Sequence, residues 1–158
     1  MNNETAFDFF HGSYDIVNRW RTDFLDPADG DDRWEEFPGT SQASVHFDGR
    51  ASFDEVSFPT KGFAGLTLRL YDPAADAWSL YWASKRTGTL FPPVSGRFGD
   101  DGVGVFLGDD EHDGRRVRVR FIWSEITPDS AHWEQAFSVD GERTWITNWH
   151  MWLTRSVR

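Results

Sequence analysis

The sequence predicts an all-β fold: one closed, antiparallel, up-and-down β-barrel of about eight to ten strands, in a single domain spanning residues 1–158. A length of 158 residues suits one domain. Short segments alternate apolar and polar residues with the period of two that is typical of strands. Turn sequences rich in Asp, Gly and Pro separate these segments by few residues, so neighbouring strands are antiparallel. Closing such a series into a barrel removes the exposed edges.

Ten segments carry the strand pattern, and one short segment near the N-terminus is the single candidate for a helix or turn. The expected strands are residues 13–25, 34–47, 51–58, 62–71, 78–84, 94–98, 102–107, 115–124, 130–138 and 144–154. The candidate helix or turn is residues 4–11, where Phe7, Phe9 and Phe10 are expected to cap one end of the barrel.

The apolar face of each strand is expected to point into the barrel. A ligand-binding barrel carries polar residues inside as well, so in one or two strands the polar face, instead of the apolar face, is allowed to point inward. The faces expected inside are Leu66, Leu68 and Leu70; Trp78, Leu80 and Trp82; Val117, Val119, Phe121 and Trp123; and Trp145, Trp149, Met151 and Leu153.

Charge and cysteine content exclude several classes of function. The formal net charge is −10, and such an acidic surface repels nucleic acid and anionic membranes, so we expect neither as a partner. The chain has no cysteine, which removes disulfides, thiolate catalysis and thiolate metal sites. No signal peptide or membrane-spanning run is recognisable, so a soluble, cytoplasmic protein is expected, either a monomer or a homodimer.

Tryptophan content points to a ligand cavity. Nine tryptophans occur in 158 residues, almost all of them in strand-like segments. Trp is large and amphipathic, and it lines concave apolar sites as readily as it fills cores. Trp20, Trp82 and Trp149 are the first choices for walls that hold a planar or polyene molecule.

Polar residues within the apolar strands are the remaining candidates for a site. They are Asn18, Arg69, Arg120, Glu134, Gln135 and His150. Either they point to solvent and pair across neighbouring strands, or some of them converge inside the barrel. Inside, an Arg among Trp faces binds a carboxylate or enolate, and a neighbouring Glu or His moves protons.

No metal site or cofactor is predicted. The run Asp109-Asp-Glu-His-Asp113 offers hard ligands, but adjacent residues on a turn rarely converge on one ion, so a solvated hairpin tip is expected. No His-x-x-x-His pair is present. A haem barrel needs one proximal histidine on a cavity wall, and nothing distinguishes His46, His132 and His150 for that role.

The first predicted strand resembles the start of a calycin, the superfamily that joins lipocalins and fatty-acid-binding proteins. Its Gly-x-Trp motif is matched by Gly12-Ser13-Tyr14, with Tyr in place of Trp. The resemblance implies that Tyr14 plugs the closed end of the barrel and that Arg155 packs across it. Further stretches, among them 34–39, 65–72, 78–82 and 133–141, are similar to bacterial lipocalin-like proteins of the domain-of-unknown-function 1579 type, which brings no assigned activity.

Two functions follow. The first is binding of a small hydrophobic or aromatic, possibly anionic, molecule in a Trp-lined cavity that includes Asn18 and Arg69. The alternative is a cofactor-independent isomerase or cyclase that acts on a secondary metabolite in the same cavity, through arginine and proton transfer by Glu134 or His150. A packed barrel without a ligand also stays open. The observation that decides between these hypotheses is which face of residues 66–71, and which face of residues 115–123, points into the barrel.

Overall fold

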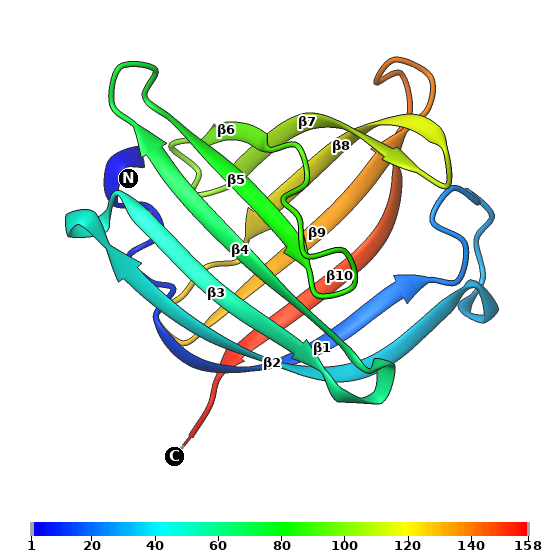
Figure 1. Ribbon diagram of the computed structural model, residues 1–158, viewed down its shortest axis with the longest axis horizontal. Helices are drawn as coiled ribbons and strands as arrows, with labels where there is room; N and C mark the ends of the chain where they lie inside the picture. The colour runs from blue at the N-terminus through cyan, green and yellow to red at the C-terminus, as the bar shows by residue number, and fades with distance from the viewer. Residues whose placement is uncertain (1, 158) are drawn as a thin grey trace.

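The computed structural model describes residues 2–157, which form one closed ten-stranded antiparallel barrel (Figure 1). Each strand pairs with its neighbours in sequence, and β1 pairs with β10 to close the barrel. The predicted fold class is therefore confirmed. The strands are β1 (Gly12–Arg21), β2 (Trp34–His46), β3 (Ala51–Phe58), β4 (Phe63–Asp72), β5 (Ala77–Ser84), β6 (Val94–Phe98), β7 (Gly104–His112), β8 (Arg115–Ser124), β9 (Ser130–Ser138) and β10 (Ile146–Arg155).

Helical structure is limited to single 3-10 turns. The N-terminal segment, for which a helix or turn was expected, forms the 3-10 turn η1 (Asn3–Thr5), and the others in residues 2–157 are η2 (Asp31–Arg33), η3 (Phe47–Gly49) and η4 (Pro59–Lys61). Among residues 2–157, no helix is long and apolar enough to cross a membrane.

The N-terminal segment closes one end of the barrel, on the left in Figure 1. Phe7 and Phe10 are buried, and the Phe7 ring packs edge-on against Trp78 at a centroid distance of 4.9 Å. The Trp78 indole donates a hydrogen bond to the backbone carbonyl of Asn3 (2.7 Å), which ties the segment to β5. The expected phenylalanine cap is therefore present, although it is built on turns rather than on a helix.

Tyr14 and Arg155 meet at the same end, as the calycin resemblance implies. Tyr14 is buried, and its hydroxyl donates to the carbonyl of Phe9 (2.8 Å). The Arg155 guanidinium donates to the Tyr14 hydroxyl (2.8 Å) and lies 4.8 Å from the centre of the Tyr14 ring. This pair links β1 to β10 at the point where the barrel closes.

Truncating Tyr14 to Ala is expected to lower the free energy of unfolding by roughly 2–4 kcal/mol, because a buried aromatic ring is replaced by a cavity. Tyr14→Phe removes only the hydroxyl and is expected to cost about 1 kcal/mol. Urea unfolding of both variants measures the difference. A Tyr14→Ala loss no larger than that of Tyr14→Phe would contradict a plugging role for the ring.

Strand β4 has the phase opposite to the default prediction. Arg69 is buried and Leu66 is 40% exposed, so the leucine face of β4 points outward and the face with Gly65, Thr67 and Arg69 points inward. The expectation that Leu66, Leu68 and Leu70 fill the interior was therefore wrong. The faces expected inside on β5 and β8 are confirmed, since Trp78, Leu80, Val117, Val119 and Trp123 are all buried.

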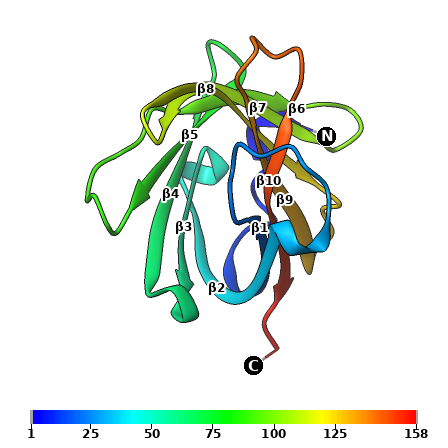
Figure 2. The ribbon, with the colours of Figure 1, turned by 90° about the vertical axis from the view of Figure 1, so that its right-hand side faces the viewer.

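Strands β1 and β10 also differ from the prediction near the open end. β1 ends at Arg21 rather than at residue 25, and the Arg21 guanidinium donates to the carbonyls of Thr147 and Ala28 (2.9 and 2.8 Å), which folds the next loop over the barrel (Figure 2). In β10, a bulge between Thr147 and Trp149 shifts the register. Trp145, expected inside, instead packs on Arg120 of the outer face, with the guanidinium 4.6 Å from its ring.

Candidate functional site

A cavity of about 200 Å³ lies inside the barrel, between the phenylalanine cap and the open end. Its lining is mostly apolar and includes four tryptophans from four different strands. They are Trp82 of β5, Trp123 of β8, Trp133 of β9 and Trp149 of β10. Because alternate residues of a strand share a face, each of these rings is carried inward by the period of its own strand.

Trp149 stands at the centre of the aromatic wall. Its ring packs nearly perpendicular to Trp133 (centroids 5.1 Å apart), Trp20 (5.3 Å) and Trp82 (6.4 Å). Its indole N–H donates to Oδ1 of Asn18 (3.1 Å), which is fully buried on β1. Edge-to-face packing and this hydrogen bond fix the ring orientation, so the wall is preformed.

Gly65 makes room for Trp82. A Cβ atom at position 65 would lie 2.1 Å from the Trp82 ring, and Gly65 faces Ser84 in the register between β4 and β5. The indole therefore lies directly against the backbone of β4. Any larger residue at position 65 would push Trp82 further into the cavity.

The floor of the cavity is a buried ion pair. Arg69 of β4 donates from Nη2 to the Asp54 carboxylate of β3 (2.5 Å) and from Nη1 to the Ser52 hydroxyl (3.1 Å). The Ser41 hydroxyl of β2 donates to the second carboxylate oxygen of Asp54 (3.0 Å). Each of these four side chains is at most 3% exposed. The network joins three adjacent strands and neutralises the arginine inside the barrel.

Aromatic rings surround the Arg69 guanidinium. Its central carbon lies 5.0 Å from the Phe10 ring, 5.3 Å from Phe7 and 5.5 Å from Trp123. Arg69 Nε and Trp123 Nε1 are buried without a hydrogen-bond partner in residues 2–157. Both side chains line the cavity together with Asp54, so the floor presents these two N–H donors beside a carboxylate that is already paired.

The cavity reaches the open end beside β7. Pairing between β6 and β7 ends at Ser95 and Leu107, whereas β7 continues alongside β8 as far as His112. The last five residues of β7 therefore have no partner on the β6 side. Phe91 and Pro92, from the loop before β6, line the cavity next to this unpaired edge.

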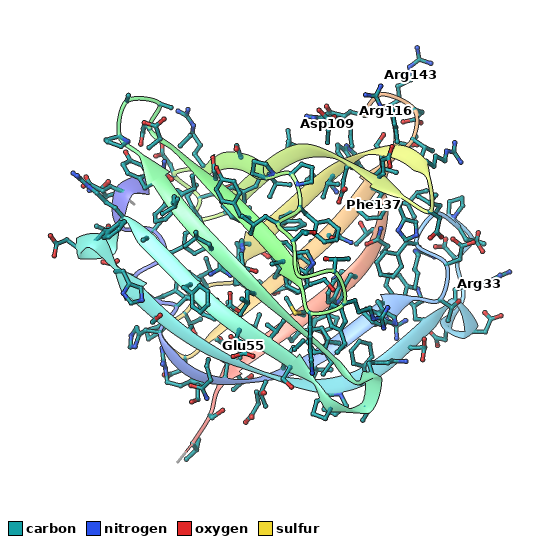
Figure 3. All side chains as sticks on the ribbon, viewed as in Figure 1. Arg33, Glu55, Asp109, Arg116, Phe137 and Arg143 are labelled. Carbon is teal, nitrogen blue, oxygen red and sulfur yellow. The ribbon has the colours of Figure 1, made fainter. Side chains whose placement is uncertain are left out.

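This edge of β7 is acidic. Asp109, Asp110 and Glu111 all line the cavity, and Figure 3 shows Asp109 near this end, with Phe137 on β9 below it. Asp109 accepts from Arg118 Nη1 (3.0 Å). Burial raises the pKa of the Asp110 carboxyl, and a hydrogen bond from the Glu111 backbone N–H acts in the opposite direction. The run expected to be a solvated hairpin tip therefore forms a strand edge at the cavity mouth.

The structure divides the residues proposed from the sequence into three groups. Arg69, Trp82, Gln135 and Trp149 line the cavity. Asn18 and Trp20 point inward but lie behind the wall, where both contact Trp149.

The third group lies on the outer face of the barrel. Arg120 alternates with the inward Val119 and Phe121, and Glu134 with the inward Trp133 and Gln135. His150 alternates with Trp149 and Met151 in the same way. Their expected convergence inside the barrel is therefore corrected. None of the histidines considered for haem is among the residues that line the cavity.

His150 belongs to a different cluster, on the outer face of β9 and β10. Its Nδ1 lies 2.9 Å from Nε2 of His132, and ligand atoms of His132, Glu134 and His150 all lie within 4.8 Å of one another. Desolvation lowers the pKa of His150 to about 4, with further contributions from His132, Arg19 and Arg21. Glu134 and His150 therefore cannot serve as the proton-transfer groups of an enzyme that uses the cavity.

Sequence reasoning missed several parts of the site. Asp54, Ser52 and Ser41 form the floor with Arg69, and Phe10 and Trp133 complete the walls. One signal was available, since Asp54 and Arg69 are opposite charges on consecutive predicted strands. Finding the pair required the register, which places Asp54 opposite Thr67, two residues from Arg69.

The closed barrel, its plugged end and its aromatic cavity together define a lipocalin-like architecture. A solved structure with this fold is the S-type phycobiliprotein lyase CPES from Guillardia theta, which aligns with a TM-score of 0.56 at 13% sequence identity. The alignment covers 96% of this chain and 91% of the lyase. At this identity the likeness concerns the fold. No protein-family model matches the sequence, and a search of curated proteins finds no match.

Proposed function

We propose that this protein binds a small molecule with one or two apolar rings, neutral or cationic, in the barrel cavity. The observation that carries the proposal is the preformed cavity walled by Trp82, Trp133 and Trp149, which reaches the surface beside the acidic edge of β7. The structural neighbour is a phycobiliprotein lyase with the same barrel fold, and this agrees with small-molecule binding. The cytoplasmic location and the monomeric or homodimeric state remain predictions. The resemblance to proteins of the domain-of-unknown-function 1579 type also remains a prediction.

The size of the cavity limits the ligand. An engineered apolar cavity of about 150 Å³ accommodates benzene. The cavity here is about 200 Å³, which suits one ring with a short substituent or two fused rings. A long polyene, which the tryptophan content alone allowed, is too large to be enclosed without movement of the walls.

The charges favour a neutral or cationic ligand over an anion. Arg69 is the one arginine or lysine side chain among the described residues that line the cavity, and it is already paired with Asp54. At the mouth, Asp109 is paired with Arg118 and Glu111 faces Arg116 across the strand pair, so Asp110 is the carboxylate that a ligand would meet. Tryptophan faces attract cations through the ring quadrupole. An amine at the mouth would therefore be attracted by the Asp110 carboxylate and by the aromatic rings of the wall. A carboxylate there would be repelled by Asp110.

A matched series of ligands tests this proposal by isothermal titration calorimetry. The series consists of 2-phenylethylamine, 2-phenylethanol and 3-phenylpropionate, which carry the same ring with positive, zero and negative charge. We expect the amine to bind at least as tightly as the alcohol, and the carboxylate to bind most weakly. Tightest binding of the carboxylate would overturn the charge argument, and no binding of any member would overturn the proposal.

Trp82→Leu provides the residue-level control. It removes one indole from the wall and keeps an apolar side chain, so binding of the neutral 2-phenylethanol should weaken by about tenfold, which corresponds to about 1.4 kcal/mol. Trp152→Leu, on the outer face of β10, is the matched control and should leave the affinity unchanged. Equal effects of the two substitutions would place the ligand outside the cavity.

Binding of the amine should depend on pH through Asp110. The raised pKa means that this carboxylate is protonated, and loses its attraction for a cation, at a higher pH than an ordinary aspartate. The affinity for 2-phenylethylamine should therefore fall as the pH is lowered from 7 towards 4.5, while that for 2-phenylethanol stays constant. Asp110→Asn should reduce the affinity for the amine by roughly fivefold, equivalent to about 1 kcal/mol, and should flatten the pH dependence.

A further inference from the structure

The outer face of β9 and β10 brings together two imidazoles and a carboxylate that the cavity does not use. His132 and Glu134 are two residues apart on β9 and therefore share a face. His150 of β10 lies directly opposite Glu134 in the register. Candidate ligand atoms of all three lie within 4.8 Å of one another, and His132 is buried.

The two imidazoles meet through their nitrogens rather than through their faces. His132 Nε2 lies 2.9 Å from His150 Nδ1, while the ring centroids are 5.1 Å apart and the planes differ by 11°. One nitrogen must carry the hydrogen and the other must accept it. One nitrogen lone pair and one N–H thus meet beside the Glu134 carboxylate.

The second nitrogen of His132 already has partners that orient a metal ligand. Its Nδ1 lies 3.4 Å from the Glu125 carboxylate and 3.4 Å from the Ser124 hydroxyl. A hydrogen on Nδ1, bonded to the Ser124 hydroxyl and facing the Glu125 carboxylate, leaves the Nε2 lone pair free to point at Glu134 and His150. A carboxylate behind a ligating histidine fixes the tautomer and raises the basicity of the ring in many metal sites.

We propose that His132 Nε2, His150 Nδ1 and the Glu134 carboxylate form a binding site for Zn²⁺, in which the ion takes the place of the hydrogen between the two imidazoles and that hydrogen moves to Nε2 of His150 as the ring changes tautomer. Two imidazoles with one carboxylate are a common ligand set for this ion, and the fourth tetrahedral position remains open to water. Zn–N bonds of about 2.0–2.1 Å at a tetrahedral angle require the nitrogens to separate to roughly 3.4 Å. A small rotation of the half-buried His150 ring supplies that widening.

The charged groups around this face nearly balance. Arg19 of β1 lies opposite His150, and Arg21 stacks on Trp34 with its guanidinium 4.5 Å from the ring centre. Arg19 is paired with Glu36 and Asp31 at 3.2 Å each, so its charge is already compensated. Glu125 and Glu134 supply two carboxylates to the two histidines. Arg21 donates to backbone carbonyls and has no carboxylate partner in residues 2–157, so it is the one cation that the two glutamates must offset at this site.

Zinc titration calorimetry on untagged protein tests the proposal. We expect one Zn²⁺ per chain and a rise in Tm on addition of Zn²⁺. His150→Ala and Glu134→Gln should each weaken binding by at least about tenfold, and Glu125→Gln, which touches no metal, should weaken it by roughly tenfold. His46→Ala, which removes an exposed histidine at the end of β2, is the matched control and should leave the affinity unchanged.

The outcomes separate this site from other acidic groups. Loss of binding in the His150 and Glu134 variants but not in the His46 variant supports the site. Zinc binding that survives both substitutions would assign the ion elsewhere, for example to the acidic edge of β7, and would overturn the proposal. Absence of stoichiometric binding by the unaltered protein would also overturn it. Glu134→Gln changes one half-buried carboxylate, so its folding can be verified by the unchanged Tm without metal.

Discussion

Replacing Arg69 by Met is expected to lower the free energy of unfolding by about 3–5 kcal/mol, because it leaves a buried carboxylate without its cation. Asp54 is 2% exposed, and within residues 2–157 the one other hydrogen bond to its carboxylate comes from Ser41. Urea unfolding monitored by tryptophan fluorescence measures the loss.

A double-mutant cycle separates the pair from general damage to the interior. Arg69→Met combined with Asp54→Leu removes both charges and should recover most of the lost stability, because replacing a buried ion pair by apolar residues is often nearly neutral. Ser52→Ala, which removes one hydrogen bond to Arg69 (3.1 Å), should cost about 1 kcal/mol. Losses that simply add in the double variant would show that Arg69 and Asp54 are not coupled.

Replacing Trp149 by Ala is expected to destabilise the barrel by about 3–5 kcal/mol, as for other buried Trp truncations. The ring packs against Trp20, Trp82 and Trp133, and its N–H donates to Oδ1 of Asn18. The substitution also enlarges the cavity, so the variant should accept a larger ligand such as naphthalene more readily than the unaltered protein does. Unfolding and calorimetric titration measure the two effects.

Trp152→Ala is the matched control for this prediction. Trp152 lies on the outer face of the same strand and is 40% exposed, so its truncation should cost about 1 kcal/mol or less. Ligand size preference should not change. A loss as large as that of Trp149→Ala would mean that the tryptophan wall of the cavity contributes no more to stability than a surface ring.

The barrel itself was predictable because its signals are local. Period-two segments and turn residues located all ten strands, and short connections implied the up-and-down order. The closed end was also predictable, since Tyr14 and Arg155 lie at the start of the first strand and the end of the last one. These two residues pair in the register between β1 and β10.

The phase of β4 was not predictable from its own residues. The three leucines form the more apolar face, but the arginine on the other face is satisfied by Asp54, Ser52 and three aromatic rings. Partners on other strands decide whether a polar face is tolerated inside. The leucines consequently lie on the outside, with Leu66 40% exposed.

The acidic end of β7 was misread for a related reason. Asp and Glu are unfavourable in strands by propensity, so the run Asp109–Asp113 was expected to be a loop. In the register, Asp109 faces Arg118 and Glu111 faces Arg116, and opposite charges across a strand pair stabilise it. The turn then shortens to Asp113 and Gly114, both with positive φ, as tight hairpins prefer.

The histidine cluster shows the same limit. Residues 132 and 134 share a face in any strand, but their meeting with His150 depends on the register between β9 and β10. A search for two histidines on one segment could not find it. Local patterns thus located the strands, while the cavity floor, its acidic mouth and this cluster arise from pairings between strands.

A crystal structure of the protein soaked with 4-bromophenethylamine tests the central claim most directly, because bromine can be located by its anomalous scattering. The account predicts the bromophenyl ring inside the barrel, among Trp82, Trp133 and Trp149, with the ammonium group at the edge of β7 near Asp110. Bromine found only on the outer surface, with side chains filling the interior, would contradict it.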